Sequence, residues 1–249
     1  DYAIQGAGGL MSVTGERDDL GGGPQKVGVA VADLFTGMYA TVAILAALRH
    51  AERTGQGQHI DMALLDVQVA MLANLGANFL VSGRPADKVP GRMGNAHQNV
   101  VPYQVFETAP TASGERDHMI LAVGNDGQFA KFCAIAGHPE WASDPRFATN
   151  PARVENRALV NDMVQAIVSA RPRADWIELF EKSGVPCAGL QTIDEVLTHP
   201  QTIELAMLQR TPDGRKAFMG TPLSFDGKRP PQERDPPELG ADTAMILKR

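Results

Sequence analysis

Cysteine, aromatic residues and clustered positive charge are all scarce in this 249-residue sequence. The two cysteines, Cys133 and Cys187, lack metal-ligand spacing, so we expect small buried thiols in a reducing compartment and no metal site. The 23 Lys and Arg residues are scattered and the formal net charge is −6, which argues against a nucleic-acid partner. The histidines likewise share no ligand spacing.

The sequence also lacks a secretory signal and any long apolar run free of polar residues. Its longest apolar stretch, residues 62–81, contains Asp66, Gln68, Asn74 and Asn78. These polar side chains favour a buried helix over a bilayer span. We therefore expect a cytoplasmic protein without a membrane partner.

What is present is an ordinary composition for a folded protein, 43% hydrophobic and 21% charged. Apolar residues recur at helical spacing over 34–53, and a second helix is predicted for 63–81 after a short strand at 59–62. Strands at 103–108 and 119–123 flank a polar turn, which predicts a hairpin. Further elements are predicted in the second half of the chain, namely helices at 126–136, 156–170, 173–183 and 193–197, and one or two strands after residue 209.

This mixture predicts an α/β fold without internal repeats. We expect residues 1–90 to form a portion of a large domain that carries the candidate nucleophile described next. Residues 91–201 are predicted to form a smaller α+β domain inserted into it. The C-terminal segment, 202–249, is predicted to return to the large domain.

Asp33 stands where the first long helix begins. A carboxylate there lies close to the positive end of the helix dipole and to free backbone amides, which favour its ionised form. A charged carboxylate can attack an acyl carbon when water is excluded, so Asp33 is a candidate nucleophile. The alternative, from spacing alone, is a residue that only caps the helix.

A loop rich in Gly and Asn, residues 92–103, is the second candidate site. Gly94 and Asn95 permit unusual backbone angles, so the N–H groups here are candidates to converge on an oxyanion. Arg92 and His97 are candidates to meet an anionic group. The alternative is a plain connecting loop.

Several runs of this sequence resemble the class III CoA-transferase family (CaiB/BaiF), which includes formyl-CoA transferase. The runs keep the family's order and spacing across nearly the whole chain, which makes the match more specific than any single run. They are 5–15 (QGAGGLMSVTG), 27–38 (VGVAVADLFTGM), 44–48, 54–58, 61–66, 92–103, 144–147, 156–157 and 184–186.

The resemblance implies a Rossmann-like large domain with an inserted small domain, and an interlocked homodimer. It also places the family's catalytic aspartate on Asp33. That residue would attack an acyl-CoA thioester to give a mixed anhydride, which the CoA thiolate then converts to an aspartyl-CoA thioester. An acceptor carboxylate reverses both steps, so the reaction needs no metal or other cofactor beyond the CoA thioester substrate. The run 101–106 is most similar to members that use succinyl-CoA and dicarboxylic acids such as glutarate.

The resemblance assigns further site residues. Asp1 aligns with an acidic active-site position, and Leu64 aligns with an apolar contact to CoA. The loop matches the position of a four-glycine run that shields the intermediate, but here that run reads His97-Gln98-Asn99-Val100. The substrate-binding residues implied by the match are Leu64, Arg92, Gly94, Asn95, Ala96, His97, Gln98 and Asn99.

The family's N-terminal third, which supplies most contacts to the CoA nucleotide, has no match in this sequence. The chain begins at Asp1 rather than Met, so we expect further sequence upstream. Two alternatives to a transferase stay open. One is an acyl-CoA racemase of the same superfamily, although the context of residues 33–37 favours a transferase. The other is a non-catalytic assembly module.

Overall fold

The computed structural model describes residues 1–81 and 89–248, and these form two compact units, 1–188 and 189–249. Residues 82–88, near the end of the predicted portion 1–90, lie outside the described residues. The predicted division into 1–90, 91–201 and 202–249 is a different kind of division and stays a prediction. The return of 202–249 to the large domain stays a prediction.

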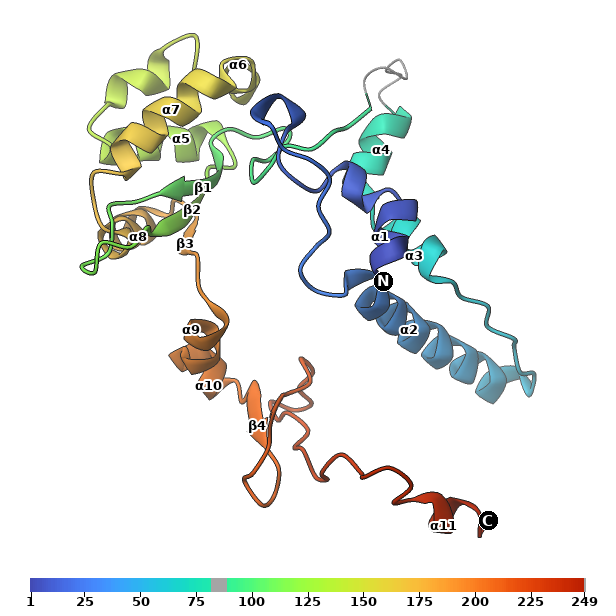
Figure 1. Ribbon diagram of the computed structural model, residues 1–249. Helices are drawn as coiled ribbons and strands as arrows, with labels where there is room; N and C mark the ends of the chain where they lie inside the picture. Colours follow the sequence, from blue (N-terminus) through green and yellow to red (C-terminus); the bar gives the residue numbers. More distant parts are fainter. Residues whose placement is uncertain (82–88, 249) are drawn as a thin grey trace. The chain divides into compact units, whose positions relative to one another are not determined.

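The first unit begins with four helices. They are α1 (Tyr2–Ala7), α2 (Val31–Thr54), α3 (Leu64–Ala70) and α4 (Ala73–Val81) (Figure 1). The long helix predicted for 34–53 is confirmed as α2, which ends where Gly55 adopts a φ of 73°. Glycine has no Cβ to hinder this left-handed conformation, so it ends the helix at little cost.

The single helix predicted for 63–81 is wrong, because α3 and α4 are separate and bent by 65° relative to each other. The chain turns at Ala73, whose φ is 40°. The predicted strand at 59–62 is also absent, since these residues run extended without a pairing partner. A single β-like run cannot form a strand unless a neighbour supplies the hydrogen bonds.

The apolar side chains of α2 are largely uncovered. Along this helix the side chains with roughly half or more of their surface exposed are Leu34, Phe35, Met38, Tyr39, Val42, Ile44, Leu45 and Leu48. The helix is long and apolar enough to cross a bilayer, and α3 with α4 would qualify if the bent pair were one span. A core helix of a larger domain has the same length and hydropathy, so these properties alone do not assign a membrane.

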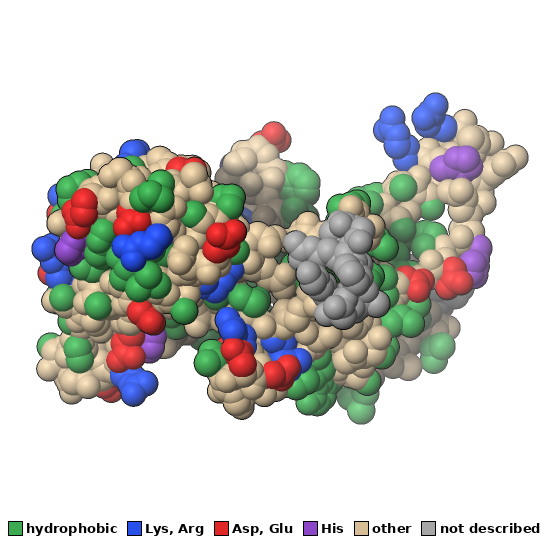
Figure 2. Space-filling model, turned by 90° about the horizontal axis from the view of Figure 1, so that it is seen from above, with side chains coloured by type: hydrophobic (Ala, Val, Ile, Leu, Met, Phe, Trp, Pro, Cys, Tyr) green, Lys and Arg blue, Asp and Glu red, His purple; other side chains and the backbone are tan. Residues whose placement is uncertain are grey.

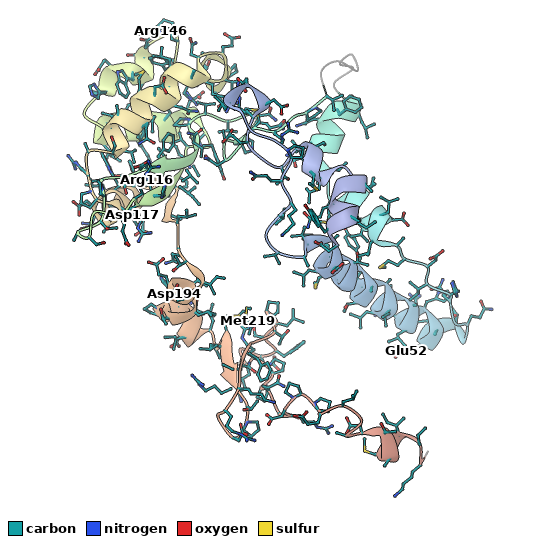
Figure 3. The ribbon with its side chains drawn as sticks, in the orientation of Figure 1. Glu52, Arg116, Asp117, Arg146, Asp194 and Met219 are labelled. Carbon is teal, nitrogen blue, oxygen red and sulfur yellow. The ribbon has the colours of Figure 1, made fainter. Side chains whose placement is uncertain are left out.

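Residues 101–188 form a second packed region of this unit. Strands β1 (Tyr103–Glu107) and β2 (His118–Ala122) pair antiparallel, with Val105 opposite Ile120, so the predicted hairpin is confirmed. A third strand, β3 (Cys187–Gly189), extends the sheet in the order β1-β2-β3 and was not predicted. Arg173 forms an ion pair with Asp117 in the hairpin, where Figure 3 also labels Arg116.

Helices pack against this sheet around one hydrophobic core (Figure 1). They are α5 (Asp126–Ile135), α6 (Asn150–Glu155), α7 (Arg157–Val168) and α8 (Arg173–Ser183). The chain also forms 3-10 helices at Leu10–Ser12, Asp18–Leu20 and Pro139–Ser143. Cys133 is fully buried in the core, and burial raises the pKa of its thiol to about 11. Burial also raises the pKa of Cys187, so both thiols stay protonated at neutral pH.

Arg153 is a charged residue in the middle of this core, with no exposed surface. Its guanidinium donates to the carbonyls of Val101 and Phe147, each at 2.7 Å, and to Oδ1 of Asp126 at 2.8 Å. It also lies 4.4 Å from the ring centroid of Phe129. These contacts compensate the desolvation of the charge and connect α6 to the start of β1 and to α5.

The second unit contains α9 (Ile193–Thr198), α10 (Pro200–Glu204), β4 (Leu208–Arg210), β5 (Ala217–Met219) and α11 (Thr243–Ile246). The strands β4 and β5 pair antiparallel, which confirms the strands predicted after residue 209. Among the described residues of this unit, no large hydrophobic side chain is fully buried. Met219, for example, is 78% exposed (Figure 3).

Basic and acidic side chains are interspersed over the surface seen in Figure 2. The view agrees with the scattered positions of Lys and Arg in the sequence, because no broad basic stripe lies on this face.

The contacts of Arg153 give a stability prediction. We expect Arg153→Lys to lower the free energy of unfolding by about 3 kcal/mol, because one ammonium cannot replace three guanidinium hydrogen bonds in a buried site. Urea denaturation of the full-length protein measures the change. The control is Arg146→Lys, which alters an exposed ion pair with Asp144 and should change stability little (Figure 3). Equal effects of the two substitutions would contradict the assignment.

Candidate active site

Asp33 is the third residue of α2, and its side chain is 54% exposed. The helix begins after Ala30, which has no side chain able to cap it. Asp33 does not cap the helix either, because no side-chain cap hydrogen bond is formed there. The nitrogen of Asp1 lies 3.2 Å from Oδ1 of Asp33. The carboxylate therefore stays accessible at the start of a long helix.

Asp1 supplies the missing cap to α2 from another part of the chain. Its Oδ1 accepts a hydrogen bond of 2.9 Å from the amide of Ala32, the second residue of the helix. An unpaired amide in the first turn of a helix is normally satisfied by a side chain within the same segment. Here the cap comes from 31 residues away, and it brings the two predicted catalytic residues, Asp1 and Asp33, together.

Gln5 completes the contacts of Asp1 and was missed from the sequence. Its Nε2 donates to Oδ2 of Asp1 at 2.7 Å, and its Oε1 accepts from the amide of Val27 at 2.9 Å. The side chain has no exposed surface. Two signals in the sequence pointed to it: the spacing of four residues from Asp1, which places both on one face of a helix, and its place at the start of the matching run 5–15.

The proposed role of Asp33 requires that water be excluded from its carboxylate. The structure shows that carboxylate exposed. Asp33 is exposed, as are the apolar side chains of α2 beside it. It does not line the cavities of about 670, 240 and 120 Å³ found among the described residues. Burial would require other chain segments to cover the start of α2. The sequence pattern of the helix predicts such a cover, because apolar side chains are normally withdrawn from water.

The loop at 94–99 is held by hydrogen bonds within the chain. The amide of Gly94 donates to the carbonyl of Gly15 at 2.9 Å, and the amide of His97 donates to the carbonyl of Tyr103 at 2.9 Å. The amide of Asn99 donates to Nδ1 of His97 at 3.0 Å. These N–H groups already have acceptors, so in this conformation they do not converge on an empty oxyanion position.

Arg157 is a second residue whose role the sequence did not reveal. Its guanidinium donates to the carbonyls of His97 at 2.8 Å and Gln98 at 2.6 Å. Burial lowers the pKa of Arg157, and the nearby charge of Arg17 lowers it further. The guanidinium stays charged at neutral pH even so, and it connects α7 to the loop.

The six predicted residues at positions 94–99 each line at least one of two cavities. A cavity of about 670 Å³ includes Asn95 and Ala96 together with Arg17 and Arg157 in its wall. A second, of about 240 Å³, is lined by Ala96 again and by Gly94, His97, Gln98 and Asn99. Arg92 lines neither cavity, and its guanidinium instead pairs with the carboxylate of Asp18.

Leu64, the predicted apolar contact to CoA, is the first residue of α3 and is half-buried. Within the described part of the chain, no hydrogen bond, ion pair or shared cavity wall connects Asp33 to Leu64 or to the loop. The described part of the chain also contains no group of three or more His, Cys, Asp or Glu side chains that could hold a metal ion. The structure thus joins Asp1 with Asp33 and leaves the predicted binding residues apart from them.

A family model described as CoA-transferase family III matches residues 1–243. The chain belongs to this family. The succinate–glutarate CoA-transferase of Agrobacterium fabrum is 45% identical over 99% of the chain, and the succinyl-CoA:glutarate CoA-transferase of mouse is 35% identical over 96%. A crystal structure of a CAIB/BAIF family protein from Brucella suis covers the whole chain with 42% identity and a TM-score of 0.79.

The chain spans only part of these family members. It covers 59% of the Agrobacterium protein, 53% of the mouse protein and 62% of the Brucella chain. The match of the family model to residues 1–243 confirms the resemblance to the class III family that the sequence indicated. The mixed helix and sheet architecture of the family is present in the described residues.

The contacts of Arg157 predict how firmly the loop is held. We expect Arg157→Ala to increase amide hydrogen exchange at residues 94–99 by at least about tenfold, because the loss of two charge-assisted hydrogen bonds eases local opening. Exchange is read by mass spectrometry on the full-length protein. Arg116→Ala, an exposed arginine of the β1–β2 connection, is the control and should leave the loop unchanged (Figure 3). Unchanged exchange in Arg157→Ala would contradict the proposed role.

Proposed function

We propose that the full-length protein transfers coenzyme A from an acyl-CoA to a carboxylic acid, with Asp33 as the nucleophile. The observation that carries the proposal is the state of Asp33 at the start of α2. Its carboxylate is accessible and is not used as a cap, because Asp1 occupies the Ala32 amide. Membership of CoA-transferase family III supports the same reaction class.

The proposed reaction begins with the carboxylate of Asp33 and a thioester. An oxygen of Asp33 attacks the thioester carbonyl and expels the CoA thiolate, which leaves a mixed anhydride on the protein. The thiolate then attacks the aspartyl carbonyl, releases the donor acid and forms an aspartyl-CoA thioester. The acceptor carboxylate attacks that thioester, and the released thiolate attacks the acceptor's acyl carbon, which regenerates Asp33. Each step exchanges one acyl bond for another, so the proposal includes no cofactor beyond CoA itself.

The substrates proposed are succinyl-CoA as donor and a dicarboxylic acid such as glutarate as acceptor, in the cytoplasm. The names of the Agrobacterium and mouse proteins support this choice, and the Agrobacterium protein is 45% identical to this chain. A dicarboxylate acceptor keeps one charged group after it is acylated. A basic side chain is the group expected to bind that second carboxylate.

An acyl-aspartate would be hydrolysed if water reached it, and Asp33 is 54% exposed in this chain. The exposed apolar side chains of α2 begin directly beside it, at Leu34 and Phe35. The proposal therefore includes a cover over the start of α2, supplied by the remaining part of the protein and by a second copy in an interlocked homodimer. Covering this face would remove both apolar side chains and Asp33 from water together.

The nucleophile is tested by Asp33→Asn in the full-length protein. Turnover of succinyl-CoA with glutarate is expected to fall by on the order of 10⁴-fold or more, since an amide cannot form the acyl intermediate. The matched control is Asp66→Asn, because Asp66 occupies the first turn of α3 as Asp33 does that of α2. In the unsubstituted protein, hydroxylamine should convert Asp33 to a hydroxamate only after acyl-CoA is added. Exchange of the substrate's α-proton without such an adduct would instead indicate a racemase.

The interlocked dimer is tested by subunit exchange. Light scattering of the full-length protein should give twice the mass of one chain over a tenfold dilution. Tagged and untagged dimers, once mixed, should form no hybrid until they are unfolded and refolded together, because interlocked chains cannot separate while folded. A monomer, or rapid formation of hybrids, would contradict the proposal.

A further inference from the structure

We propose that Gln5 is a positioning residue for the nucleophile and that Asp1 acts by holding Asp33 in place rather than as an acid or base. This inference rests on the proposed function of Asp33. It assigns a role to a buried side chain that bonds to Asp1 and to the amide of Val27 rather than to Asp33. Three hydrogen bonds made by the side chains of Asp1 and Gln5 carry it.

The oxygens of Asp1 are both occupied as hydrogen-bond acceptors. Oδ1 accepts from the amide of Ala32 at 2.9 Å, and Oδ2 accepts from Nε2 of Gln5 at 2.7 Å. Neither donor can accept a proton back, since one is a backbone N–H and the other an amide NH₂. A carboxylic acid at this position would have to donate from one of these oxygens. The contacts therefore suit a carboxylate that has no proton to transfer.

Gln5 determines which atoms donate and which accept in this hydrogen-bond network. Its Oε1 accepts from the amide of Val27 at 2.9 Å, so its NH₂ group must face Asp1. Since Gln5 has no exposed surface, water cannot take over either contact. The amide of Gln5 thus connects the start of α1 to the segment that leads into α2.

The segment between these contacts contains the turn that sets the direction of Asp33. Val27 is held by Gln5 and Ala32 is held by Asp1, so the chain from 27 to 32 is fixed at both ends. Asp33 follows Ala32 directly, as the third residue of α2. A shift of this segment by about 1 Å would misplace the attacking oxygen, and such a displacement typically costs on the order of 10²-fold in rate.

The network can be rebuilt with its polarity reversed. In the double variant Asp1→Asn with Gln5→Glu, the new asparagine still accepts from Ala32 through its oxygen. Its NH₂ group donates to the new glutamate, which still accepts from Val27. Every hydrogen bond is restored and the number of carboxylates is unchanged, but the charge leaves position 1.

The experiment compares Gln5→Leu, Asp1→Asn and the double variant in the full-length protein. Each single variant is expected to lower kcat by on the order of 10²-fold, with little change in the KM for acyl-CoA. The double variant should recover most of kcat and keep the pH profile of the parent. A double variant as slow as Asp1→Asn would overturn the proposal, because it would show that the charge of Asp1 is itself required.

A second readout does not depend on turnover. Amide exchange of Val27 and Ala32, followed by NMR, should accelerate at least tenfold in Gln5→Leu and return to the parent rate in the double variant. If exchange follows this pattern but the parent has no CoA-transferase activity, the positioning network stands and the proposed function fails. If Gln5→Leu leaves both exchange and kcat unchanged, Gln5 has no positioning role.

Discussion

A hydrogen bond of 2.9 Å connects the carboxylate of Asp1 to the amide of Ala32, and the geometry around Asp33 depends on it. Helix α2 starts after Ala30 without a capping side chain of its own. A helix start without a local cap leaves backbone amides that must find a partner elsewhere. That partner is Asp1, at the start of α1. The bond therefore holds the start of α1 against the start of α2, where the candidate nucleophile Asp33 lies.

The periodic elements were predictable because their signal is local. The helix at α2 and the β1–β2 hairpin follow from residue spacing alone. The break between α3 and α4 was not predictable, since no Gly or Pro marks Ala73 and the left-handed φ there depends on packing. Strand β3 is three residues long and exists only because β2 offers it a partner.

The candidate site was predictable only where its signal is local to the sequence. Asp33 is recognisable from its place before an apolar helix and from the family resemblance. Gln5 and Arg157 are not, because their roles consist of contacts to backbone atoms of Val27, His97 and Gln98. Almost every residue type has the same backbone N–H and C=O groups, so the sequence does not indicate which of them binds a given side chain. Only the folded structure shows these pairs.

Asp1 caps α2 and Asp33 is the proposed nucleophile, and this separation of roles affects the proposed reaction. A hydrogen bond from an amide to a carboxylate stabilises the charged form by about 1.5–3 kcal/mol, and a nucleophile gives up part of that stabilisation when it attacks. Asp1 takes the Ala32 amide, so Asp33 does not carry the cost of that particular bond, although its Oδ1 lies 3.2 Å from the nitrogen of Asp1. Relative to a capping aspartate, roughly a tenfold gain in rate would follow at the lower end of that range, which suits a half-exposed group. The cap therefore keeps the helix start satisfied and leaves the neighbouring carboxylate of Asp33 outside that hydrogen bond.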